Sequence, residues 1–122
     1  MIGAVLVVED DALVRMAAVA MIEDAGFRVH AAATADEALV IMGREADVSL
    51  LFTDVDMPGT MDGLRLTELV HRGGGPDVKL IVASGRVKIR DCDLPDDGRF
   101  VQKPYFAAAI RATIDSVTRH PT

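Results

Sequence analysis

The chain has 122 residues, of which 50% are hydrophobic and 4% aromatic, and it carries a formal net charge of −6 at pH 7. This length predicts one domain over residues 1–122, with no effector domain, and the core it can bury needs neither disulfides nor a structural metal. The acidic balance excludes nucleic acid and membranes as expected partners, because both present negative phosphates. Cys92 is the only cysteine, so an internal disulfide is excluded and a reducing cytoplasm is favoured.

The opening stretch of the chain is apolar and stops at the acidic run from Glu9 to Asp11. It is far too short to cross a membrane and predicts a first buried strand. Either Asp10 or Asp11 can then cap a first helix, which Gly26 ends. The apolar positions that we expect on the buried face of this helix are Leu13, Ala17, Ala20 and Met21.

Two further strands and a helix are predicted before the middle of the chain. Residues 27–33 have the composition of a second strand, and Thr34 and Glu37 have the spacing of a capping box at the start of a second helix. Residues 48–53 predict a third strand, and Asp54 follows it directly.

The second half of the chain continues the same alternation. Residues 79–83 predict a fourth strand that leads to Ser84, and residues 99–102 predict a fifth strand that leads to Lys103. Residues 86–98 fit neither a helical nor a strand period, so we expect a short or irregular fourth helix there. Apolar stripes predict helices on either side of this region, at Leu66, Leu69 and Val70 and at Phe106, Ile110, Thr113, Ile114 and Val117.

Strands that alternate with helices predict an α/β fold with buried parallel strands, whose carboxyl ends form the usual ligand-binding edge. Acids, a hydroxyl and an ammonium would converge at that edge. If the first and third strands are neighbours, Glu9, Asp10 and Asp54 lie close together and repel one another. We expect Mg²⁺ to reduce this repulsion, since it prefers oxygen ligands, and Lys103 would supply a second positive charge.

Four motifs stand at the ends of these strands, in a fixed order. They are Val7-Val8-Glu9-Asp10-Asp11, Asp54-Val55-Asp56-Met57-Pro58-Gly59 with Met61-Asp62-Gly63-Leu64, Val82-Ala83-Ser84-Gly85, and Lys103-Pro104-Tyr105. With them the chain resembles the receiver domain of two-component response regulators along essentially its whole length. The resemblance implies a flavodoxin-like, doubly wound sheet of five parallel strands in the order 2-1-3-4-5.

The resemblance also implies roles for several residues of these motifs. Asp54 would be the phosphoryl acceptor. Glu9, Asp10 and Asp54 would hold Mg²⁺ together with the backbone carbonyl of Asp56, and Lys103 would pair with the phosphoryl oxygens. The protein would then be a phosphoacceptor rather than an enzyme, promoting only its own phosphotransfer and slow dephosphorylation.

Two further pairs of residues are expected to modulate this site. In the resembling family, a hydroxyl at the position of Ser84 bonds the phosphoryl group, and an aromatic residue at the position of Phe100 fills the space it leaves. Asp56 and Arg86 flank the site, and we expect a contact between them that covers the phosphoryl group and tunes its hydrolysis.

The expected partners are a histidine kinase or histidine phosphotransfer protein and a downstream protein target. A phosphate shuttle and a direct effector both stay open, as does a fragment of a larger kinase or regulator. A phosphohydrolase of the haloacid dehalogenase class ranks lower, because its Asp-x-Asp motif opens the domain, whereas about 50 residues precede Asp54 here. A pseudo-receiver that only binds partners is disfavoured because acceptor, acidic pair, hydroxyl and lysine are all present.

Overall fold

A computed structural model of the chain describes residues 3–55, 63–74, 78–84, 98–103, 105 and 107–118. The expected fourth helix falls on residues 86–98, of which 86–97 lie outside the described ranges, and the expected site residues Asp56 and Arg86 also lie outside them.

The described residues form one sheet of five parallel strands, in the order β2-β1-β3-β4-β5. The order that the resemblance implied is therefore confirmed. The three central strands β1, β3 and β4 are largely apolar on both faces because helices cover both faces, and all five residues of β1 are fully buried. The strand bounds are Ala4–Val8 for β1, Arg28–Ala32 for β2, Val48–Asp54 for β3, Lys79–Ser84 for β4 and Arg99–Gln102 for β5.

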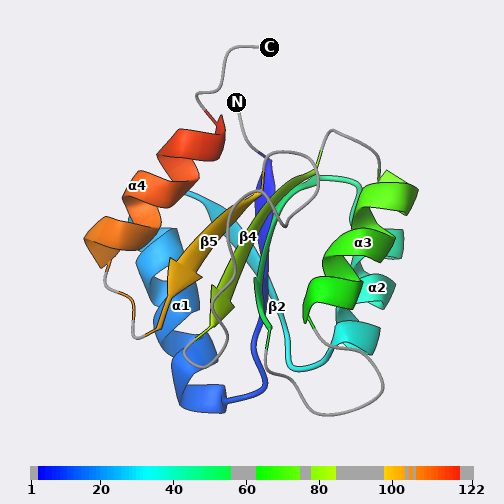
Figure 1. Cartoon of the computed structure of the whole chain (residues 1–122), viewed down its shortest axis with the longest axis horizontal. Coiled ribbons are helices and arrows are strands. Elements are labelled where there is room, and N and C mark those ends of the chain that lie inside the picture. The colour runs from blue at the N-terminus through cyan, green and yellow to red at the C-terminus, as the bar shows by residue number, and fades with distance from the viewer. Residues whose placement is uncertain are drawn as a thin grey trace.

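Four helices are described: α1 at Ala12–Asp24, α2 at Ala35–Arg44, α3 at Gly63–Gly74 and α4 at Ala107–Thr118. Figure 1 shows α1 and α4 on one face of the sheet and α2 and α3 on the other. The core is accordingly split into two main layers. The first contains Val5, Val7, Ala18, Ile22, Leu50, Phe52, Ile81, Ala83, Val101, Ile110 and Ile114. The second contains Leu6, Val8, Ala32, Ala35, Ala38, Val48, Leu51, Leu66, Val70, Val78 and Leu80.

Helix α1 begins and ends with the signals expected from the sequence. Asp11, one of the two predicted caps, accepts hydrogen bonds from the backbone N–H groups of Leu13 and Val14 at 2.9 and 3.1 Å. At the other end Gly26 has φ of 100°, and the N–H groups of Gly26 and Phe27 bond back to the last turn of the helix. This is a Schellman motif, which requires the left-handed conformation that glycine adopts without strain.

The buried face predicted for α1 is wrong at three of its four positions, and only Met21 packs against the core. Ala18 and Ile22 face the core, whereas Leu13 is 77% exposed and Ala17 and Ala20 are also exposed. Almost every position of this helix before Glu23 is apolar. The helix therefore has no polar face whose position would identify the buried face from the sequence.

The start of α2 carries the predicted capping box, with one difference. The Thr34 hydroxyl accepts a hydrogen bond from the Glu37 N–H at 3.1 Å, as expected. The Glu37 carboxylate reaches back to the N–H of Ala33 at 2.9 Å, one residue before the cap itself. Both hydrogen bonds fix the path of the chain as it leaves β2.

Candidate functional site

The register of the sheet brings the ends of β1, β3, β4 and β5 to one edge. Val8 lies opposite Thr53, Asp54 opposite Ala83, and Ser84 opposite Gln102. Because Glu9 follows Val8 and Lys103 follows Gln102, the acid and the ammonium reach this edge from strands on opposite sides of Asp54. The predicted convergence of Glu9, Asp54, Ser84 and Lys103 is therefore confirmed for the backbone.

Glu9 is fixed through its backbone and its side chain. Its N–H bonds to the carbonyl of Ala32 at 3.1 Å, continuing the ladder between β1 and β2, and its carbonyl accepts a hydrogen bond from Arg15 at 2.9 Å. Carboxylate oxygen Oε2 accepts from the N–H of Asp11 at 3.2 Å, and Oε1 accepts from Lys103 at 2.5 Å. These contacts hold one buried carboxylate in a single orientation.

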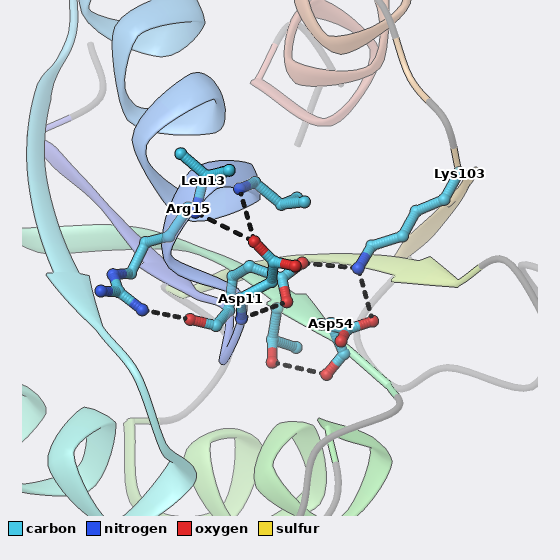
Figure 2. A network of polar contacts seen from close by, with 8 residues as sticks. Asp11, Leu13, Arg15, Asp54 and Lys103 are labelled. Atoms are coloured by element: carbon cyan, nitrogen blue, oxygen red, sulfur yellow. Dashed lines mark hydrogen bonds and ion pairs between the residues drawn. The ribbon is translucent and has the colours of Figure 1, made fainter.

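Lys103 joins the two buried acids of the site. Its Nζ lies 2.5 Å from Oε1 of Glu9 and 3.2 Å from Oδ1 of Asp54, and the side chains of both acids are only 4% exposed. Figure 2 shows the side chain of Lys103, the residue after β5, extending toward Asp54, with Arg15 on the other side of Asp11. The backbone of Lys103 is held as well, since its N–H bonds to the carbonyl of Ser84 at 3.0 Å.

The electrostatics follow from burial and from the shared ammonium. Burial raises the pKa of Glu9 above its usual value, although the hydrogen bonds from Lys103 and Asp11 pull in the opposite direction. Burial alone would lower the pKa of Lys103, but the hydrogen bond to Glu9 and the charge of Asp54 outweigh it, so the net shift is upward. The ammonium is therefore held in its charged form beside two carboxylates.

The donor set of this edge fits a hard divalent cation. Glu9, Asp10 and Asp54 each offer a carboxylate oxygen, and the three oxygens lie within 4.8 Å of one another. Glu9 and Asp54 are buried, whereas Asp10 is exposed, so the cluster has one acid that faces solvent. Oxygen ligands of this kind are those that Mg²⁺ prefers. The three acids predicted to bind a metal are thus brought together.

The predicted switch residues lie beside this edge. Ser84 is 1% exposed at the end of β4, the strand next to the one that carries Asp54. Phe100 is partly buried in β5 and packs against Val55 and Val82 on the sheet face that carries α2 and α3. The positions are those that a coupled movement needs, and the movement itself stays a prediction.

Two residues near the site were missed at the level of sequence. Arg15 donates to a backbone carbonyl, a contact that no motif encodes. Tyr105 belongs to the predicted lysine motif, but its packing could not be read from it: its ring meets that of Phe52 edge to face, with centroids 5.5 Å apart. Burial and the nearby charge of Glu9 raise the pKa of Tyr105 to about 12.

Comparisons with known proteins agree with this geometry. Residues 5–115 match the family model of the response regulator receiver domain. The chain is 37% identical over 114 residues to the sensor kinase CckA of Brucella abortus, and 37% identical over 123 residues to the response regulator protein FleR of Pseudomonas aeruginosa. These alignments cover 90% and 98% of this chain but only 12% and 25% of the two relatives.

The fold is also that of solved receiver structures. A response regulator receiver domain protein from Clostridium thermocellum superposes with a TM-score of 0.84 at 19% identity, covering 97% of this chain and 96% of that one. None of these similarities favours the phosphohydrolase or the pseudo-receiver. Within the described part of the chain, no helix has the length and apolar character needed to span a membrane.

Proposed function

Because the chain belongs to the response regulator receiver domain family, we propose that its Asp54 carboxylate accepts a phosphoryl group from a phosphohistidine donor. The family acts as a phosphoacceptor in two-component signalling, and its members receive phosphoryl groups from histidine kinases. The observation that supports Asp54 is its burial at the end of β3 with an ammonium 3.2 Å from one of its oxygens.

The reaction transfers one phosphoryl group between two side chains. An oxygen of the Asp54 carboxylate attacks phosphorus while the bond from phosphorus to the donor imidazole nitrogen breaks, and the imidazole keeps that electron pair. We propose that Lys103 compensates charge on the phosphoryl oxygens, because its Nζ lies 3.2 Å from Oδ1 of Asp54 and its raised pKa favours the protonated form. The Ser84 hydroxyl, at the end of the neighbouring strand, is proposed to bond the transferred group.

Receiver domains generally bind Mg²⁺ at an acidic pocket. We propose that Glu9, Asp10 and Asp54 bind it here, completed by the backbone carbonyl of Asp56. When bound, Mg²⁺ neutralises negative charge on the phosphoryl oxygens and so lowers the barrier to attack by a carboxylate. Glu9 meanwhile keeps the β1 end rigid through its bonds to Ala32 and Asp11.

The wider role follows from the same proposal. The phosphorylated form is proposed to bind a downstream protein differently from the free form, through Ser84 and Phe100, with Asp56 and Arg86 tuning the lifetime of the acyl phosphate. We further propose that residues 1–122 act as one receiver domain in the cytoplasm. With a single cysteine the chain forms no internal disulfide, so a reducing compartment suits it.

Intact mass after incubation with a small acyl phosphate tests the acceptor. The native protein should gain the mass of one phosphoryl group with Mg²⁺ present and lose that gain with a chelator. Asp54→Asn should show no gain. Asp47→Asn is the matched control. Asp47 is also a partly buried acid in an ion pair, but its partner is Arg28 and the pair lies away from the site.

Two results would contradict the proposal. A gain in mass that persists in Asp54→Asn would place the acceptor elsewhere, and continuous release of phosphate from a phosphomonoester would favour a phosphohydrolase.

The tuning role is tested separately by timing the loss of the phosphoryl group from an Arg86→Ala variant. An unchanged half-life of the phosphorylated protein would remove Arg86 from that role.

A further inference from the structure

Arg15 makes a contact that ties α1 to the acidic loop. It lies in the first turn of the helix, is half-buried, and its Nη1 donates a hydrogen bond of 2.9 Å to the backbone carbonyl of Glu9. That carbonyl belongs to the planar peptide group that links Glu9 to Asp10. The Arg15 guanidinium therefore fixes the orientation of the peptide group that joins Glu9 and Asp10.

The two acids differ in what else holds them. Glu9 is buried, and both of its carboxylate oxygens accept hydrogen bonds, from Lys103 and from the N–H of Asp11. Asp10 is exposed, and its carboxylate lies beside that of Glu9, so the backbone that joins the two residues sets the positions that this carboxylate can reach. Fixing the peptide between them bears most directly on whether Asp10 points toward the other two acids.

We propose that Arg15 is a positioning residue of the Mg²⁺ site, acting through the Glu9 carbonyl and not by touching the metal. The inference rests on the metal site of the proposed function. Groups that orient the ligands of a metal without binding it typically change affinity by about 10- to 100-fold when they are removed.

The charge of Arg15 makes the direction of the effect diagnostic. A guanidinium near three carboxylates repels an incoming cation, so removing its charge alone would strengthen Mg²⁺ binding. Removing the hydrogen bond to Glu9 would release the peptide and weaken Mg²⁺ binding. The two roles of Arg15 therefore predict opposite changes in the dissociation constant.

Calorimetric titration of the unphosphorylated protein with Mg²⁺ measures this constant. Arg15→Met keeps the helix preference and an unbranched apolar stem but has no donor, whereas Arg15→Gln keeps a polar end that is two atoms too short to reach. We expect a dissociation constant raised by about tenfold in both variants. Arg111→Met is the control, because Arg111 is an exposed arginine of α4 and its loss changes the net charge equally.

A dissociation constant that is unchanged or lower in the Arg15 variants would overturn the inference. If Arg15→Met does not fold, the Gln variant decides in the same way. Saturating Mg²⁺ should restore the phosphorylation rate of the variants, which a purely structural defect would not allow. Magnesium binding by the native protein without phosphorylation would defeat the proposed acceptor alone, whereas phosphorylation with unchanged affinity in the variants would defeat the inference alone.

Discussion

Replacing Lys103 by Met should destabilise the folded protein at neutral pH, even though the substitution removes a polar group. The ammonium lies 2.5 and 3.2 Å from carboxylates that are each 4% exposed. At an effective dielectric constant of about 20, each of these contacts contributes roughly 5 to 7 kcal/mol of gross attraction. Desolvation of the ions offsets much of this, and breaking such a buried pair typically costs about 3 to 5 kcal/mol net.

The loss should depend on pH because Glu9 can take up a proton. The pKa of Glu9 is already raised by burial, and removing the hydrogen bond from Lys103 takes away a contact that lowers it. An acid whose pKa is higher in the folded state loses stability as pH rises from its unfolded pKa through its folded pKa. The difference between Lys103→Met and the native protein should therefore be small in mild acid and grow toward neutral pH.

Urea unfolding followed by circular dichroism, with a chelator present, measures both effects. We expect a loss of about 3 kcal/mol at pH near 7 and a clearly smaller loss at pH near 5. Lys79→Met is the matched control, because Lys79 is also a partly buried lysine of the sheet but lies at the start of β4, away from the acids. A loss below about 1 kcal/mol, or one of equal size at both pH values, would refute the reasoning.

Three further results are expected. Tyr105 is the only tyrosine, so the tyrosinate absorbance of the folded protein should rise with a midpoint near its raised pKa of about 12, and a midpoint equal to that of the urea-unfolded chain would contradict its burial. Gly3→Ala should lower the free energy of unfolding by about 1 to 3 kcal/mol, because the Cβ of the new alanine would stand 2.2 Å from the Asp47 carbonyl oxygen. The control is Gly43→Ala in α2, whose Cβ meets no atom within 4 Å and which should stabilise the protein slightly. Asp11→Ala should cost about 1 kcal/mol in the same unfolding assay by removing the cap of α1, and an unchanged midpoint would show that the two hydrogen bonds contribute nothing.

The sheet and the meeting of the site residues could be predicted from sequence for one physical reason. Strands buried on both faces are continuous apolar runs, and in a parallel sheet each run delivers the residue that follows it to the same edge. Glu9, Asp54 and Ser84 each come at the end of such a run, and Lys103 follows the shorter and more polar β5, so their positions depended only on the strand order. The strand order itself came from the resemblance, because alternation alone implied no more than an α/β fold.

The errors and omissions have equally local causes. The buried face of α1 was misassigned because Leu13 and Ile22 are equally apolar, and only packing against the sheet places the first outside and the second in the core. The contact of Arg15 goes to a backbone carbonyl, which every residue possesses, so no residue pattern signals it. Lys103 was expected to pair with the phosphoryl oxygens, which stays a prediction, and its hydrogen bond to Glu9 was not expected.

The ion pair between Lys103 and Glu9 joins residues that are 94 positions apart in the sequence. A contact of such long range closes late in folding, because the loop entropy of the whole intervening chain opposes it until the strands between have assembled. The buried acids at the ends of β1 and β3 therefore acquire their balancing ammonium only when the edge strand β5 joins the sheet.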